Sequence, residues 1–274
     1  MTSLERAARP AAWAEPPAVL RFVLDAWTVA EAELQKLAHD PTELLTRAVQ
    51  PVLWLLVFGE VLARARAIPT GRLDYIDFLA PGVLAQSALF SAIFFGIAVI
   101  WERDLGVLHK YLVSPASRLS LVTGKALAGG LRALVQAAVV YVVAALIGVH
   151  LQLGIPQILG VAVVLVLGAA GFATFSLVIA CLVRTRERFM GIGQVLTMPL
   201  FFASSAVYPV ALMPTWLQVL AKVNPLTYQV DALRSLMVSG GTATFPVPLD
   251  AGVLVLALAV LLLIAGRLYP RLAM

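Results

Sequence analysis

The residues of this chain that could do chemistry are few, and their spacing fits none of the common catalytic or nucleotide-binding sites. Gly124-Lys125 is followed by Ala126 and has no glycine at the upstream position of a G-x-x-x-x-G-K-[ST] nucleotide-binding loop. The three histidines are scattered along the chain, and the single cysteine, Cys181, permits neither an intrachain disulfide nor a cysteine metal site. No acid–base pair or nucleophile–base pair is found. We therefore expect no catalytic residue, no metal and no cofactor in this chain.

The acidic residues are also poorly placed to couple transport to an ion gradient. Ion-coupled carriers keep carboxylates at mid-depth in the membrane, where a charge is costly and is retained for function. Here Glu60 falls near the end of one apolar segment, and Glu102 and Asp104 fall at the end of another. We therefore expect the driving force to come from outside this polypeptide.

The composition predicts that these residues are positioned by helices in a membrane. Hydrophobic residues make up 61% of the 274 residues and charged residues 13%, against about 25% charged residues in an ordinary soluble domain. The apolar residues come in blocks of about 18–27, long enough to cross a hydrocarbon core about 30 Å thick. We predict an all-α integral membrane protein in which residues 44–274 form one domain with six transmembrane helices. The predicted spans are residues 44–63, 78–101, 126–149, 157–183, 189–208 and 249–266.

The chain before the first span is expected to lie outside the hydrocarbon core. Residues 1–18 are rich in Ala and Pro and are expected to form a mobile tail. Residues 19–43 have the pattern of an amphipathic helix, which favours a position in the membrane interface rather than across it. Its apolar side carries Leu20, Val23, Leu24, Trp27, Ala30, Leu34 and Leu37, and its polar side carries Arg21, Asp25, Glu31, Glu33 and Lys36.

The distribution of basic residues predicts the orientation. Fourteen of the twenty Lys and Arg residues fall on the side of the two termini, and five fall on the opposite side. Because cytoplasmic loops carry the excess of basic residues, both termini are expected in the cytoplasm. Arg132 is the remaining basic residue and lies inside a predicted span.

Residues 102–125, between the second and third predicted spans, form a loop with a distinctive pattern. It opens with three charged residues, continues with an apolar run and turns at Ser114-Pro115. This pattern indicates a short amphipathic helix at the membrane surface. The residues alone leave two interpretations open, a solvated connector or a docking element whose apolar side fits a groove on a partner.

Two sequence motifs carry a resemblance to a known family. The loop resembles the E-R-x-x-G-x-L…L-x-S-P signature of type-2 ATP-binding-cassette (ABC) exporter permeases. A second segment, before the last span, resembles the other signature of that family. Its matching residues are Tyr208-Pro209, Met213-Pro214, Trp216-Leu217, Asn224-Pro225-Leu226-Thr227-Tyr228 and Asp231-Ala232-Leu233-Arg234. Within the family, the chain resembles the daunorubicin-resistance and nodulation-factor export group.

The resemblance implies a permease of a bacterial cytoplasmic membrane that works as a homo- or heterodimer. It also implies two copies of a separate cytoplasmic P-loop ATPase, which would bind the ATP and Mg. Residues 19–43 would then be the connecting helix, and the 209–234 segment would form short re-entrant helices on the outer side. The residues expected to couple to the ATPase are Glu102, Arg103, Asp104, Leu105, Gly106, Val107, Leu108, Leu112, Ser114 and Pro115. Those expected at the outer gate are Tyr208, Pro209, Pro214, Trp216, Asn224, Pro225 and Tyr228.

Two predicted spans carry glutamine and aromatic residues that could line a substrate pathway. A glutamine in a water-poor setting needs a partner or a cavity, and aromatic rings give broad contact to amphipathic molecules. Ordinary helix packing or lipid contact is the alternative for each residue singly. The candidates are Gln86, Phe90, Phe94 and Phe95 in the second span, and Gln194, Met198, Phe201, Phe202 and Ser205 in the fifth.

The function that these features favour is export of amphipathic molecules, such as drugs, lipids or glycolipids, by alternating access and at the expense of ATP hydrolysed by another subunit. Export of polysaccharide or lipid-linked glycan is an alternative of the same class. A self-contained secondary carrier or channel is an alternative of a different class, and it would need polar or ionisable residues at mid-depth. The net charge of +5 comes from residues at the ends of apolar blocks, so no nucleic-acid partner is expected.

The topology can be tested by labelling. In a Cys181→Ala background, single cysteines at Ser117 and Thr242 should react from opposite sides of the membrane. Residue 117 should react with an impermeant maleimide only when the cytoplasmic face is opened, and residue 242 should react in intact cells. Labelling of both from the same side would contradict the six-span topology.

Overall fold

The computed structural model describes residues 17–39, 49–66, 68–107, 114, 116–183 and 185–273, and in these ranges the chain is helical, with one isolated β-bridge between Leu151 and Val238. Some of the predicted features lie outside these ranges. The tail up to residue 16, residues 40–48 and the motif positions Leu108, Leu112 and Pro115 lie outside the described residues.

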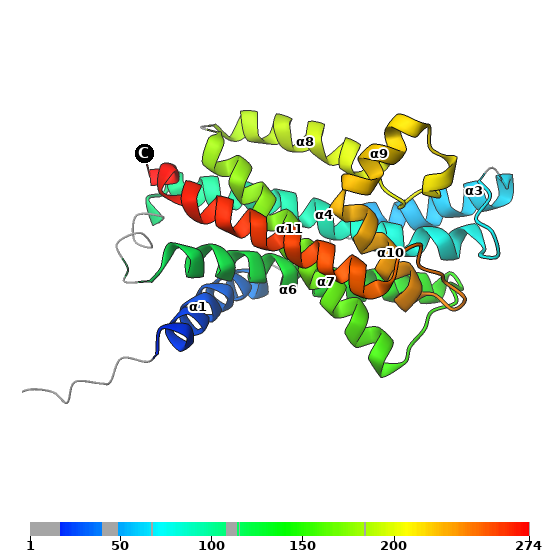
Figure 1. Ribbon diagram of the computed structural model, residues 1–274, viewed down its shortest axis with the longest axis horizontal. Helices are drawn as coiled ribbons and strands as arrows, with labels where there is room; N and C mark the ends of the chain where they lie inside the picture. Colours follow the sequence, from blue (N-terminus) through cyan, green and yellow to red (C-terminus); the bar gives the residue numbers. More distant parts are fainter. Residues whose placement is uncertain are drawn as a thin grey trace, which may run out of the picture.

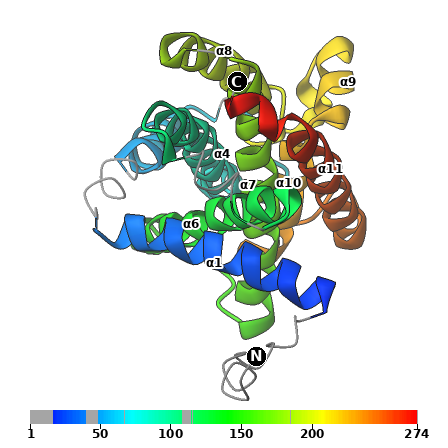
Figure 2. The ribbon, with the colours of Figure 1, turned by 90° about the vertical axis from the view of Figure 1, so that its left-hand side faces the viewer.

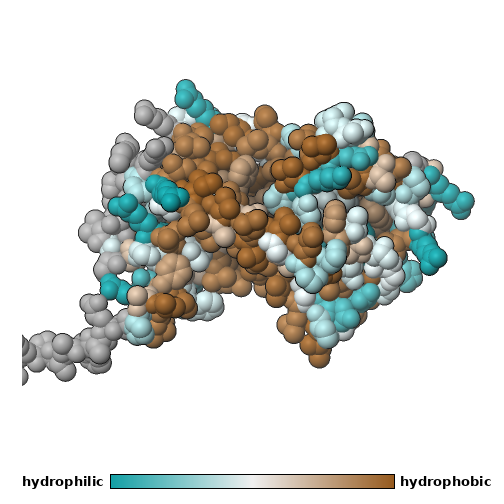
Figure 3. All heavy atoms as spheres, in the orientation of Figure 1, coloured by the Kyte–Doolittle hydropathy of each residue, from teal (hydrophilic) through white to brown (hydrophobic). Residues whose placement is uncertain are grey.

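Four helices in the described part of the chain are long and apolar enough to cross a membrane. They are α4 (Tyr75–Asp104), α6 (Arg118–Leu146), α7 (Ile155–Leu182) and α11 (Val247–Leu268). Helices α4, α6 and α11 run roughly along the long axis of the molecule, and α7 crosses it obliquely (Figure 1). They correspond to the second, third, fourth and sixth predicted spans. In Figure 3, apolar residues cover the middle of the visible face and hydrophilic residues gather toward its two ends, as expected for a protein that crosses a bilayer.

The charged loop predicted at residues 102–125 is shorter in the structure. Residues 102–104 form the last turn of α4, and α6 already begins at Arg118, where the Ser117 hydroxyl accepts the Ser120 N–H at 3.0 Å as an N-cap. Gly106 ends α4 in the left-handed conformation, with φ of 71°, and its N–H returns to the Arg103 carbonyl at 3.0 Å. Glycine adopts this conformation without steric cost, so the glycine of the motif serves to end the helix.

The first and fifth predicted spans are not among these four helices. The described part of the first, from residue 49 onward, is helical and includes the π-helical turn η1 (Trp54–Gly59) and the short helix α3 (Glu60–Ala65). The fifth forms α8 (Arg186–Phe202), which has 17 residues and ends six residues before the predicted limit. Asn224 explains this end, because its amide donates to the carbonyls of Leu200 at 2.6 Å and Ala203 at 2.8 Å, which the helix leaves unsatisfied.

The amphipathic helix α1 (Ala18–His39) lies across one end of the bundle, which we call the α1 end (Figures 1 and 2). It packs on α6, and the approach is so close that a Cβ on Gly124 would collide with the Ala26 carbonyl and with Val29. Its apolar residues Leu20 and Trp27 point away from the bundle, each about half exposed.

The opposite end, which we call the α3 end, is built from short elements. These are the 3-10 turn η2 (Val210–Leu212), α9 (Thr215–Val223) and α10 (Pro225–Met237). A further 3-10 turn, η3 (Tyr269–Ala273), follows α11 and is not part of this end (Figure 1). At 1.5 Å per residue, the 9 residues of α9 and the 13 of α10 are too few to cross a membrane.

Candidate functional site

The last turn of α4 enters a cluster of buried charges at the α1 end. The Lys125 ammonium on α6 donates to Glu33 Oε1 of α1 at 2.9 Å and to Glu102 Oε2 of α4 at 2.6 Å. Lys36, one turn after Glu33, donates to Glu102 Oε1 at 2.6 Å and to Glu33 Oε1 at 3.1 Å. Arg132 donates to the Glu33 backbone carbonyl at 3.0 Å and lies 3.5 Å from Glu33 Oε2. We call these five residues the ion cluster.

Most of the charges in this cluster are buried, so their pairing matters for stability. Lys125 is 1% exposed, Glu33 2% and Glu102 8%, whereas half of the Lys36 side chain is open to solvent. Removing such charges from water costs several kcal/mol per ion, which only close partners offset. Burial alone would raise the pKa of Glu33, but Lys125 and Lys36 outweigh it and hold that pKa well below its ordinary value. Both carboxylates therefore have an opposite charge within hydrogen-bonding distance, and three helices must be in place for this to hold.

This cluster was not predicted from the sequence. Glu33 and Lys36 were expected on the polar side of the amphipathic helix, but Glu33 lies on the side that packs against α6, together with Ala26 and Ala30. Glu102 was expected in a loop. One signal was available, because Arg132 falls in an apolar span and a charge there needs a partner.

A second set of contacts joins the end of α4 to α8. The Asp104 carboxylate accepts from Arg186 at 2.7 Å and 3.0 Å through one oxygen, and from Arg103 at 3.0 Å and 3.1 Å through the other. The Arg186 guanidinium also lies over the Trp101 ring, 4.0 Å from its centroid. Of the expected coupling residues, Glu102 and Asp104 thus contact other helices, whereas Leu105 is 71% exposed.

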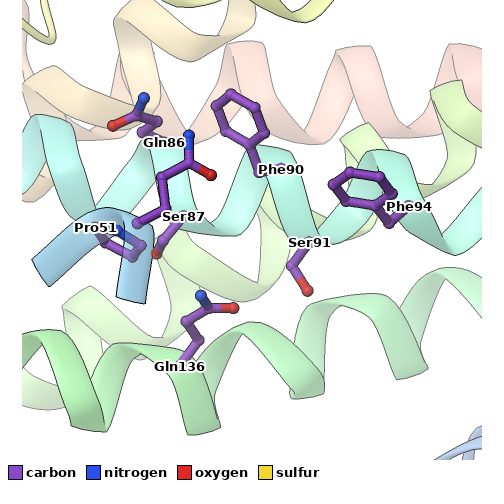
Figure 4. A pocket seen from close by; sticks show the side chains of 8 residues that line it. Pro51, Gln86, Ser87, Phe90, Ser91, Phe94 and Gln136 are labelled. Carbon is purple, nitrogen blue, oxygen red and sulfur yellow. The ribbon is translucent and has the colours of Figure 1, made fainter. Parts of the chain in front are cut away.

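The pathway candidates on α4 line a small pocket. Gln86, Phe90 and Phe94 border a cavity of about 40 Å³ together with Gln136 of α6, with both phenylalanines on one side of α4 (Figure 4). Gln86 is 3% exposed, and its side-chain oxygen has no hydrogen-bond partner within the described residues. Phe95 faces elsewhere, since its ring lies 5.4 Å from the Arg132 guanidinium and 5.8 Å from the Lys125 nitrogen.

The candidates on the fifth predicted span are not brought to this pocket. Gln194, Met198 and Phe202 lie on the exposed side of α8, whereas Phe201 is fully buried and packs edge-on against Trp54, with ring centroids 5.6 Å apart. On a helix that continued to residue 208, as predicted, Gln194, Met198, Phe201 and Ser205 would share one face. Ser205 is not on that face, because α8 has ended before it.

Several of the residues expected at the outer gate stabilise the α3 end through hydrogen bonds between side chains and the backbone. Tyr208 donates to the Phe202 carbonyl and Tyr228 to the Lys222 carbonyl, each at 2.6 Å. Asn224 caps α10 by accepting the Leu226 N–H at 3.0 Å, besides its two bonds to the end of α8. The remaining positions are Pro209, which precedes η2, Pro214, which precedes α9, the exposed Trp216 and Pro225, the first residue of α10.

One cluster of possible metal ligands at the α3 end was also missed. Ligand atoms of Asp74, Asp77 and His150 lie within 4.8 Å of one another. Asp77 accepts the His150 N–H at 3.0 Å, and the His150 ring nitrogen Nδ1 lies 2.9 Å from its other oxygen. This contact with Asp77 raises the pKa of His150 above its ordinary value. The histidine is 73 residues distant in sequence from Asp77, and no spacing pattern connects them.

The helices and the charged ends define a multi-pass membrane protein. Comparison with known proteins gives the family: residues 25–238 match the ABC-2 type transporter family, and the chain belongs to it. It is 30% identical over 220 residues to a putative transport permease, ycf38, of Cyanophora paradoxa, covering 78% of this chain and 74% of that protein.

Two further relatives belong to the groups expected from the motifs. The chain is 26% identical to the daunorubicin resistance ABC transporter permease protein DrrB1 of Streptomyces coeruleorubidus, over 76% of this chain and 72% of that one. It is 28% identical to nodulation protein J of Rhizobium leguminosarum bv. viciae, over 83% and 86%. The family prediction is therefore confirmed, and the chain is a transport permease.

The ion cluster generates a stability prediction. Lys125→Met leaves Glu33 and Glu102 buried with less compensation, so the free energy of unfolding should fall by about 3 kcal/mol. Lys36→Met is the matched control, because it removes contacts to the same two carboxylates from a half-exposed position and should cost about 1 kcal/mol or less. Reversible unfolding in mixed micelles measures both. Equal losses for the two variants would show that the burial of Lys125 carries no special weight.

Proposed function

We propose that this chain is the membrane subunit of an ATP-driven exporter and that a separate cytoplasmic P-loop ATPase, in two copies, acts on the end of α4. The ATP and Mg belong to that partner. The permease would work as a dimer in a bacterial cytoplasmic membrane and would alternate between inward and outward access.

The arrangement at the end of α4 is the observation that carries this proposal. Residues 102–106 bear the first motif of the exporter permeases and lie at the α1 end. From this single turn, Glu102 contacts α1 and α6 through the ion cluster, and Asp104 contacts α8. A displacement applied at Leu105 or Gly106 would therefore act on four helices together, which is what transmission from a partner requires.

The positions of the acidic residues favour an external energy source over ion coupling. Every Asp and Glu in α4, α6, α7 and α11 lies in the first or last turn of its helix: Asp77, Glu102, Asp104 and Asp250. A carrier driven by protons or sodium uses carboxylates at mid-depth.

The charge distribution supports an orientation in the membrane. Basic residues at the α1 end outnumber those at the α3 end, which supports a cytoplasmic α1 end and an outer α3 end. Six spans result if the helical segment from residue 49 and α8 also cross the membrane. In that arrangement α9 and α10 are the short re-entrant helices that close the outer side.

Amphipathic molecules, such as drugs, lipids or glycolipids, are the cargo class that we propose. The relatives' names refer to daunorubicin resistance and to nodulation. The pocket at Gln86 and Phe90 combines aromatic surface with an amide oxygen that has no hydrogen-bond partner among the described residues. Lipid-linked polysaccharide is the alternative cargo.

The test is co-purification and ATP hydrolysis. The purified chain alone should hydrolyse no ATP above background, and addition of its ATPase should give vanadate-sensitive turnover in liposomes. Leu105→Glu places a charge at the proposed docking surface without loss of internal packing, since Leu105 is 71% exposed, and should abolish co-purification of the ATPase.

The matched control for this test is Leu153→Glu. Leu153 is 66% exposed and lies at the α3 end, so this variant should assemble and hydrolyse ATP normally. Hydrolysis by the lone chain, or normal assembly of Leu105→Glu, would contradict the proposal. Both leucines are preferable to Gly106, where any side chain would strain the helix end.

A further inference from the structure

A large cavity opens at the α3 end, away from the ion cluster and from the pocket at Gln86. It measures about 780 Å³, within the range of small-molecule binding sites. Three loops enclose it: the connection between α3 and α4, the segment around η2 and the turn that follows α10. These contribute residues 69–73, residues 209–211 and residues 239, 240, 242 and 244, and Phe78, Ser205 and Arg234 complete the lining.

The charge of this cavity is of one sign. Two arginines, Arg72 and Arg234, are among its lining residues, and no Asp or Glu is among the described residues that line it. Ser239 and Thr242 add hydroxyl groups. Arginine remains protonated in proteins, and its planar set of N–H donors matches the oxygens of a phosphate group.

Arg234 is held in place by backbone carbonyls and an aromatic ring. It is 5% exposed, donates to the Ser205 carbonyl at 2.6 Å and to the Phe78 carbonyl at 3.4 Å, and its guanidinium lies 3.8 Å from the centroid of the Phe78 ring. Among the described residues no carboxylate pairs with it, and its Nε has no hydrogen-bond partner. A buried cation without a paired charge is costly, so a bound anion would stabilise this arrangement.

The nearby Asp231 lies one turn earlier on α10 and interacts electrostatically with Arg234, but among the described residues it forms no ion pair with the guanidinium. Its carboxylate accepts the Thr244 N–H at 2.7 Å, the Thr244 hydroxyl at 2.9 Å and the Phe245 N–H at 2.9 Å. These bonds fix the loop that contributes Thr242 and Thr244 to the wall of the cavity. Asp231 therefore shapes the cavity, and its oxygens accept hydrogen bonds from the loop rather than from Arg234.

A neighbouring cavity differs in that carboxylates line it. It measures about 490 Å³ and shares Pro69, Thr70 and Leu73 with the first, but its charged lining includes Asp74 and Asp77. The same loop therefore separates a cavity with carboxylates from one without. The second cavity also contains an exposed arginine, Arg66, which serves as a control for general surface charge.

From this geometry we infer that the cavity of Arg72 and Arg234 is a binding site for a phosphate group. Leu73, Phe78 and Val210 give the cavity an apolar wall beside the two cations, which suits the head group and upper acyl chain of a phospholipid. A free phosphate ion carries the same recognised group. Binding requires neither ATP nor transport, so this inference can fail without affecting the proposed function, and the reverse also holds.

The experiment measures binding to the full chain in detergent. Native mass spectrometry would compare phosphatidylglycerol with diacylglycerol of the same acyl chains, which lacks the phosphate. Thermal unfolding in inorganic phosphate, against chloride at equal ionic strength, would detect the free ion, because a ligand of the folded state raises the midpoint. The variants are Arg72→Gln, at an exposed position, Arg234→Gln, which removes the buried charge, and the control Arg66→Gln.

We expect phosphatidylglycerol to bind more tightly than diacylglycerol, with about tenfold weaker binding after Arg72→Gln, the effect of losing one charge-assisted contact. Arg234→Gln should weaken it at least as much, and Arg66→Gln should leave it unchanged. Stabilisation by phosphate that Arg72→Gln abolishes would identify the free ion as a ligand as well. Equal binding of the two lipids without a phosphate effect, or equal losses for Arg72→Gln and Arg66→Gln, would overturn the inference.

Discussion

The Lys125 ammonium, buried between two carboxylates, is the interaction on which the rest of the α1 end depends. Lys125 belongs to α6, Glu33 to α1 and Glu102 to α4, and each is less than a tenth exposed. Displacement of α6 would remove Lys125 and leave the two buried carboxylates with less compensation, which costs several kcal/mol. The cluster therefore specifies how α1 sits on the bundle, which hydrophobic contact, being non-directional, does poorly.

This constraint gives α4 its position in the proposed mechanism. One end of α4 is fixed by Glu102 and Asp104 to three helices. At the other end, the Tyr75 hydroxyl donates to the Val207 carbonyl at 3.2 Å, and Phe78 contacts Arg234. Most of the helix between them is buried among its neighbours. A helix held in this way can carry a displacement from the ATPase side toward the cavities at the α3 end.

Hydropathy predicted α4, α6, α7 and α11 because long apolar segments have one stable form in a bilayer. It was less successful where polar side chains decide the backbone. The early end of α8 depends on Asn224, which lies more than twenty residues later, and α6 begins early because Ser117 caps it. The motif around Glu102 was recognised, but its contacts were not. Lys125 bridges Glu33 and Glu102 only in the folded chain, so neither residue spacing nor composition could predict this contact.

The central claim, that buried charges fix α1 to the end of α4, is tested most directly by a distance measurement. In a Cys181→Ala background, spin labels at Leu24 of α1 and Ala98 of α4 would occupy exposed positions, and dilution with unlabelled protein would exclude distances between copies. Pulsed electron–electron double resonance should give one narrow distance distribution for the native protein and for Lys36→Met. It should give a broad or displaced distribution for Lys125→Met. A distribution for Lys125→Met that is as narrow as the native one and centred at the same distance would contradict the account.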